Sequence, residues 1–478
     1  MRLAVSIISI LILVSCKTPL ELSYKPTIPA QNLKMSKELQ WASLHKKTHH
    51  ISVFLNQNPQ LLYAQNKRGE TLLHLAAKAD DRKTLDYLIA CGANIESLDK
   101  RGKTPLLSAA YTGKTKAFSI LYNHGANIAA TDKTGNNASH LAAIMANQSF
   151  WAQLLELNPQ LLNHRNKRGE VAAHFAAYYA NADALAFLGN QFTHLDRLGR
   201  SPFLVACQSH YANDLLTLAL HNKIVQSRDK ITGSNALHYA VMTKKPLTAK
   251  ALIEKGTPVN TKNLKGQTAL MMASQKGDDQ LISLFLAYNA SVTQVDVLGN
   301  SLFHKLNSKD PLIINQLASK ASLKLLNQPN KEGQITLLIA AHKRKVTLVK
   351  ALLARGANVN LQDKSSESAL HKVARNQNRK ILILLLNAGI QTTLKNEDGQ
   401  TALHLALQKR SPNISFIESL IHQGKALNLI NDLEQTALDL AAIISDKEKA
   451  FQLMLMIRSH GGKTAKELKA LKKPKTSK

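Results

Sequence analysis

Histidine is the side chain in this 478-residue chain that is best suited to chemistry. Imidazole binds metal ions only where several ligands converge on one point. Seven histidines share one position in a recurring pattern, and no two of these lie at ligand spacing within one copy: His74, His140, His174, His238, His304, His371 and His404. Three more, His45, His49 and His50, share a predicted helix without a carboxylate or thiolate beside them. We therefore predict no metal site.

Motifs for catalysis and for phosphate binding are missing from the sequence. It contains no Gly-x-Ser-x-Gly elbow, no His-Glu-x-x-His, no Cys-x-x-Cys and no dinucleotide-binding glycine fingerprint. The segment from Arg458 to Thr464 is similar to a phosphate-binding loop, but such a loop needs glycine where Ile457 stands. We predict a protein that is not an enzyme and has no cofactor.

Positive charge is concentrated around a recurring glycine. The formal net charge is +30, and the last sixteen residues contain only seven of the lysines. Such a field favours anionic partners, whereas a solvated surface or a generally basic background remains the alternative. The residues expected to form a basic stripe are Lys67, Arg68, Lys100, Arg101, Lys103, Lys133, Lys167, Arg168, Arg197 and Arg200, continued by Lys230, Lys265, Lys331 and Lys364. Near the end of the chain the charge at these positions becomes negative, with Glu397, Asp398 and Asp432.

Aromatic residues accompany the basic ones in one stretch. Tyrosine beside basic groups is typical of interface anchors, and the candidates are Tyr111, Tyr178, Tyr179 and Tyr211. Phe150 and Trp151, at the start of a predicted second helix, are assigned to the core. Cys91 and Cys207 are also expected to be buried, too far apart for a disulfide.

The elements that must position these residues repeat twelve times at steps of 30 to 35 residues. The glycine position falls at Gly69, Gly102, Gly135, Gly169, Gly199, Gly233, Gly266, Gly299, Gly333, Ser366, Gly399 and Glu434. Asp or Asn stands three residues earlier, except in the sixth unit, where Lys230 holds that position and Asp229 precedes it. A helix N-cap follows two residues after the glycine, and Leu and Ala then lie on one helical face. A second helix ends in Gly-Ala-Asn. Units of this kind stack on copies of themselves to bury their apolar faces.

Over residues 36–462 this pattern resembles ankyrin repeats, with Asn66-Lys-Arg-Gly-Glu-Thr-Leu-Leu-His-Leu-Ala-Ala among the best-preserved copies. The resemblance implies an all-α solenoid of about twelve helix-turn-helix units with short β-turn fingers. It also implies that the recurrent histidine hydrogen-bonds between adjacent turns. Partner binding by the turn tips and the inner helix surface is a further implication. Residues 36–65 are expected to form an N-terminal cap.

The N-terminus differs from the rest of the chain. Arg2 precedes the apolar run from Leu3 to Leu13, which is too short to span a bilayer. Leu-Val-Ser-Cys16 resembles a bacterial lipobox, which implies that residues 1–15 are a signal peptide and that Cys16 carries lipid. Lys17 follows, so an outer-membrane lipoprotein facing the periplasm or the cell surface is expected. An ordinary secretory signal is the alternative. Residues 16–35 are predicted to be an extended tether and 463–478 a basic tail containing one short helix.

Three hypotheses follow from these features. The first is a lipid-anchored, monomeric scaffold on a bacterial envelope that binds an acidic protein partner. The second is a binder of an anionic envelope polymer or lipid, and the third is a secreted effector that engages host proteins. Nucleic acid is not expected as a partner, because an envelope location removes it and no groove-reading motif is present.

Overall fold

The computed structural model describes residues 34–188, 191–209 and 227–472. Regular structure in these ranges is helical, with isolated β-bridges such as the one between Val295 and Ser301. The chain divides into two compact units, Met1–Asp196 and Arg197–Lys478. The signal peptide, Cys16 and Tyr211 lie outside the described residues. No described helix has both the length and the hydropathy that crossing a membrane requires.

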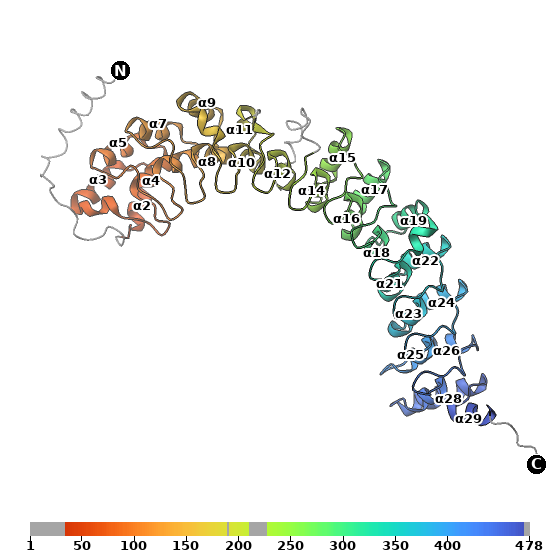
Figure 1. Cartoon of the computed structure of the whole chain (residues 1–478). Helices are drawn as coiled ribbons and strands as arrows, with labels where there is room; N and C mark the ends of the chain where they lie inside the picture. The colour runs from red at the N-terminus through yellow and green to blue at the C-terminus, as the bar shows by residue number, and fades with distance from the viewer. Residues whose placement is uncertain (1–33, 189–190, 210–226, 473–478) are drawn as a thin grey trace, which may run out of the picture. The chain divides into compact units, whose positions relative to one another are not determined.

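The first unit consists of two rows of helices (Figure 1). The inner row is α2 (Lys37–Leu44), α4 (Leu72–Ala79), α6 (Pro105–Tyr111), α8 (Ala138–Met145) and α10 (Ala172–Tyr179). The outer row is α3 (Thr48–Gln57), α5 (Arg82–Ala90), α7 (Thr115–Asn123), α9 (Gln148–Leu157) and α11 (Ala182–Phe187). Short 3-10 helices, η2 (Pro59–Tyr63) and η3 (Pro159–Asn163), follow α3 and α9. Helices α2 and α3 lie in residues 36–65, the segment expected to form the N-terminal cap.

The second unit has the same two rows. Its inner helices are α12 (Pro202–Gln208), α14 (Ala236–Met242), α16 (Ala269–Lys276), α18 (Leu302–Lys305), α21 (Thr336–His342), α23 (Ala369–Asn376), α25 (Ala402–Leu407) and α27 (Ala437–Ala442). Its outer helices are α15 (Pro246–Glu254), α17 (Asp279–Ala287), α19 (Pro311–Ser319), α22 (Val346–Ala354), α24 (Arg379–Asn387), α26 (Ile414–Ile421) and α28 (Lys447–Ser459). Two short helices complete it, α20 (Leu323–Asn327) and α29 (Ala465–Lys472), the latter within the predicted tail.

Each inner helix begins where the repeat pattern places its cap. The hydroxyl of Thr104 accepts a hydrogen bond from the Leu107 N–H at 3.2 Å, and Pro105 occupies the first helical position. The small residue seven positions after the glycine, such as Ala109, is fully buried against the next inner helix. A larger side chain there would hold the helices apart, so the Ala register sets the close stacking of the row.

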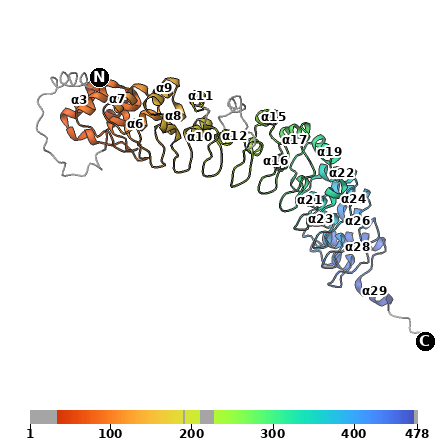
Figure 2. The same ribbon diagram turned by 45° about the horizontal axis from the view of Figure 1, so that its top comes forward.

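A finger is the loop before each inner helix, from the Asp or Asn to the residue after the glycine. Figure 2 shows these fingers projecting from one side of the inner rows. Adjacent fingers are joined through their backbones, because the Lys100 N–H donates to the Arg68 carbonyl at 3.0 Å and the Lys133 N–H to the Arg101 carbonyl at 2.9 Å. The backbone therefore fixes the spacing of the fingers, and side chains at their tips are not needed for it.

Buried aromatic and aliphatic side chains fill the space between the two rows. Phe150 and Trp151 are fully buried, as predicted, and the Phe150 ring packs edge-on against Phe118 at 5.0 Å between centroids. Cys207 is buried as expected. The prediction for Cys91 was wrong: it is the C-cap of α5 and is exposed, because the outer helix ends there at the surface.

Candidate functional site

The candidate site lies on the fingers, whose shape is set by one polar side chain in each. The Asn66 side-chain carbonyl accepts hydrogen bonds from the Arg68 N–H at 2.8 Å and the Glu70 N–H at 3.1 Å. Asp99 does the same in the next finger. Gly69 completes the turn with a φ of 78°, a conformation that side chains disfavour. A finger that is closed in this way has at its tip the two residues that directly precede the glycine.

In the first unit these tip positions hold seven exposed cations, here called the basic tip set: Lys67, Arg68, Lys100, Arg101, Lys133, Lys167 and Arg168. Within the described part of the chain, none of the seven has an acidic partner within ion-pair distance. Backbone groups of five of them are hydrogen-bonded to neighbouring fingers: Arg68, Lys100, Arg101, Lys133 and Lys167. The charged ends are therefore solvated and available to a partner.

The side chains one and nine residues after the glycine differ from the basic tip set, because they contact each other. Lys78 forms an ion pair with Glu70. In the next unit the Lys103 ammonium lies 4.5 Å from the centre of the Tyr111 ring. The same two positions pair Arg200 with Gln208, Gln400 with Gln408 and Arg375 with Glu367. Along the inner helices this spacing turns polar side chains toward one another.

This pairing corrects the expectation for Lys103 and for Tyr111. Lys103 is only 6% exposed, and burial lowers the pKa of its ammonium although nearby Asp99 opposes the shift. Tyr111 is half-buried beneath it. Neither residue stands free at a finger tip. The sequence contains a signal for this pairing, since complementary residues recur eight positions apart.

The remaining predicted anchors have mixed positions. Tyr178 and Tyr179 end α10 with their rings 5.0 Å apart, and each is about two-fifths exposed. Arg197 is exposed and Arg200 is half-buried, both in the second unit. Tyr211 falls outside the described residues.

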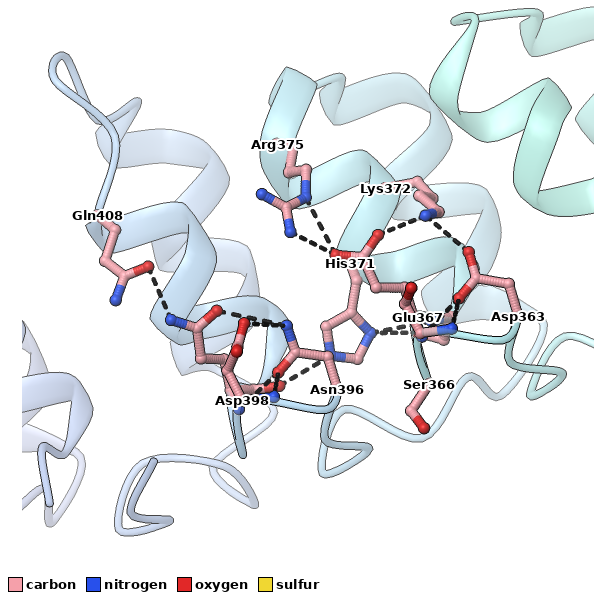
Figure 3. Close-up of polar contacts among 12 residues, drawn as sticks. Asp363, Ser366, Glu367, His371, Lys372, Arg375, Asn396, Asp398 and Gln408 are labelled. Atoms are coloured by element: carbon pink, nitrogen blue, oxygen red, sulfur yellow. Dashed lines mark hydrogen bonds and ion pairs between the residues drawn. The ribbon is translucent and has the colours of Figure 1, made fainter. Parts of the chain in front are cut away.

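Tips in the second unit change sign along the row. Lys230, Lys265, Lys331 and Lys364 are exposed, and the Lys364 ammonium donates to the Lys331 carbonyl at 3.2 Å. Three later tip residues, Glu397, Asp398 and Asp432, are exposed carboxylates. Figure 3 shows Asp398 on its finger near Asn396.

Ion pairs organise the inner-helix face of the second unit. Lys372 lies 2.7 Å from Asp363 and also contacts Glu367, which Arg375 contacts in turn (Figure 3). Burial alone would raise the pKa of Glu367, yet hydrogen bonds from Lys372 and Arg375 outweigh it and lower the pKa. Lys305 forms the corresponding pair with Asp296 at 3.0 Å.

The recurrent histidines join adjacent turns, as the resemblance implied. The Nδ1 atom of His74 accepts a hydrogen bond from the Thr71 N–H at 3.2 Å, so its Nε2–H donates to the Lys103 carbonyl at 2.8 Å. The Nε2 atom of His140 is likewise hydrogen-bonded to the next turn, at 2.8 Å from the Glu170 carbonyl oxygen. In the described residues no group of three or more His, Cys, Asp or Glu side chains is placed to hold a metal ion.

The repeats match models of a known protein family. Models of ankyrin repeats match residues 73–161, 203–296, 332–364 and 352–406, together more than half of the chain. Among solved structures, the ankyrin repeat domain of Bcl-3 is 23% identical with a TM-score of 0.40, and the match covers 47% of this chain and 99% of that one.

Curated relatives match over part of this chain. The NF-kappa-B p105 subunit of Gallus gallus is 27% identical over 37% of this chain and 18% of its own length. The phosphocholine transferase AnkX of Legionella pneumophila is 24% identical over 51% of this chain and 27% of its own length. A putative ankyrin repeat protein of Rickettsia bellii is 29% identical over 47% of this chain and 32% of its own length. The chain thus spans less than a third of the length of these relatives.

Proposed function

This chain belongs to the ankyrin-repeat family, and from that premise we propose that it is a non-enzymatic scaffold that binds an acidic protein partner through the basic tip set. Ankyrin repeats support protein–protein interaction as the general role. The enzymes among the matched relatives extend far beyond the region they share with this chain, so their activities are not transferred to it. The acidic nature of the partner comes from the charge of this chain.

One observation carries the proposal: four successive fingers hold seven exposed cations that have no ion-pair partner in the described ranges, while inner-helix charges beside them are paired. Stacked helical layers lie about 10 Å apart, so cations on neighbouring fingers act on a partner together. Complementary charge of this kind speeds encounter and selects partners. Tyr178 and Tyr179, exposed at the end of α10, would add apolar contact within the same unit.

We further propose that the scaffold is held at a bacterial envelope by lipid on Cys16. The support is the lipobox-like sequence at residues 13–16 after an apolar leader. Several acyl chains on one N-terminus anchor a protein more durably than a single chain. The tether would then carry the repeats away from the membrane surface.

The proposal is tested with a variant that reverses four tips, Lys67→Glu, Arg68→Glu, Lys100→Glu and Arg101→Glu. A matched control reverses four exposed lysines of the same unit that lie outside the fingers, Lys37, Lys47, Lys83 and Lys116, with an equal change in net charge. Immobilised proteins are exposed to a detergent extract of the producing cells, and captured proteins are quantified by mass spectrometry at increasing salt.

We expect acidic proteins captured by the native chain and by the control to fall at least tenfold with the tip variant. Equal capture by all three proteins would refute the role of the tips. If the captured material is instead an anionic polysaccharide or lipid lost with the same variant, the surface binds the polymer and the acidic-protein proposal is wrong.

A further inference from the structure

Helix α18 is the shortest of the described inner helices, with four residues where neighbouring α16 has eight and α21 has seven. Leu306 replaces the alanine that other repeats bury at this point. After Lys305 the chain turns toward α16, where the Asn307 N–H donates to the Ser274 carbonyl at 2.9 Å. Asp310 and Pro311 then start α19. One helical turn is therefore missing beside α21.

A groove of about 370 Å³ lies at this place, entirely within the second unit. Ile335, Leu338 and Ile339 of α21 and its preceding loop provide apolar lining, with Lys305 of α18 on one side and Lys372 of α23 on the other. This volume is at the lower end of the range that accommodates small ligands. Beside the missing turn of α18, Ile339 of α21 is half-buried, whereas Ile335 and Leu338 are buried.

The lining departs from the pattern of the adjacent repeats. Ile339 occupies the position six residues after the glycine, which Lys305 and Lys372 hold in the flanking repeats. Both lysines are engaged, Lys305 by Asp296 at 3.0 Å and Lys372 by Asp363 at 2.7 Å. The groove thus has an apolar patch between two ion pairs.

Uncompensated charge at the groove is positive. Lys343 and His342 are exposed at the end of α21, and within the described residues Lys343 has no ion-pair partner. The carboxylates nearby are already bound: Asp363 by Lys372, and Glu367 by Lys372 and Arg375 (Figure 3). An incoming carboxylate would find a free cation, whereas an incoming ammonium group would find no free carboxylate among these.

We propose that this groove binds a linear peptide segment in which one aliphatic side chain is flanked by carboxylates. The aliphatic side chain packs against half-buried Ile339, with Ile335 in the adjacent lining, and a carboxylate next to it lies against Lys343. This site is separate from the basic tip set, since it lies in the other unit and depends on an apolar contact.

The test uses the full chain with isotope-labelled isoleucine methyl groups and three short synthetic peptides. The first has a central leucine between glutamates, the second replaces that leucine with serine, and the third replaces the glutamates with lysines. We expect the first peptide alone to shift the methyl signals of Ile335 and Ile339, while Ile381 and Ile417, buried elsewhere in the unit, stay in place. Absence of these shifts with the leucine–glutamate peptide, or equal shifts with the serine peptide, would overturn the proposal.

Two variants locate the site by fluorescence anisotropy with the labelled leucine–glutamate peptide. Ile339→Ser and Lys343→Glu should each weaken binding about tenfold, corresponding to about 1.4 kcal/mol. Matched controls at the same positions two repeats earlier, Met272→Ser and Lys276→Glu, should leave binding unchanged. If Ile339→Ser does not fold, the peptide affinities of Lys343→Glu and Lys276→Glu are compared instead. Equal affinity of these two variants would contradict the placement of the peptide in the groove. Reversal of the first-unit tips should not alter this binding, so the two proposals fail independently.

Discussion

At the scale of single residues, the buried histidines are structural hydrogen-bonding groups that must stay neutral. Burial lowers the pKa of His74, His238 and His371, and lowers that of His140 to about 4. In His74, His238 and His371 the Nδ1 atom accepts a hydrogen bond from a backbone N–H while Nε2–H donates to the next turn, as in His371 with the Gln400 carbonyl at 3.0 Å. Protonation of Nδ1 would remove the acceptor and place a charge in the core.

This neutrality predicts a loss of stability on mild acidification. The unfolded chain binds protons on histidine near pH 6.5, whereas folded His140 resists protonation until about pH 4. Its contribution is complete above pH 6.5 and is lost as the pH falls toward 4, by about 2 kcal/mol between pH 6.5 and 5. Urea unfolding of the native chain and of His140→Gln, at pH 7.5 and 5.0, measures the difference. The variant should be less stable at pH 7.5 and lose less on acidification; an equal loss in both proteins would contradict the prediction.

At the scale of the element, the finger is a turn whose glycine also faces the next finger. A methyl group on Gly69 would lie 2.7 Å from the Lys100 backbone nitrogen. Ser366 and Glu434 hold the same position with φ of 55° and 58°. The backbone bond from Glu397 N–H to the Ser365 carbonyl, next to Ser366, is 3.3 Å long, against 3.0 Å for the bond beside Gly69. Side chains are thus accommodated at this position in two fingers, with the left-handed backbone retained.

We expect the two directions of substitution to have opposite effects on stability. Ser366→Gly should raise the unfolding free energy by about 0.5 to 1 kcal/mol, because relief of the left-handed backbone exceeds the extra entropy of the unfolded chain. Gly69→Ala should lower it by about 2 kcal/mol or more, because strain and a backbone clash add. Urea unfolding midpoints measure both changes. An unchanged midpoint for Gly69→Ala would show that adjacent fingers separate freely.

At the scale of the whole molecule, charge is distributed along rows of fingers. The first unit presents cations on successive tips, and the second passes from lysine tips to the acidic tips Glu397, Asp398 and Asp432. A partner that contacts several fingers binds by the sum of modest contacts, so affinity should depend strongly on salt.

Membrane attachment is a prediction for the complete chain. Cells that express the native protein or Cys16→Ala are fed a fatty-acid analogue that can be tagged. We expect label in the native protein alone, and the variant should leave the membrane fraction, because residues 1–15 would no longer be followed by a lipid-bearing cysteine. Equal labelling of the two proteins would show that Cys16 is not the acceptor.

The sequence alone determined the repeat, the fold class, the caps and the exposed finger tips, because these features depend on local spacing: a turn glycine, an N-cap two residues later and alanine on one helical face. Residues such as Phe150 and Trp151 could be assigned to the core for the same reason. Tertiary structure decided which charges remain free. Lys103 and Lys67 both flank a finger glycine, yet one is buried against Tyr111 and the other is exposed. The groove beside α18 exists because α18 lacks one helical turn next to α21. This gap becomes visible only when successive repeats are stacked.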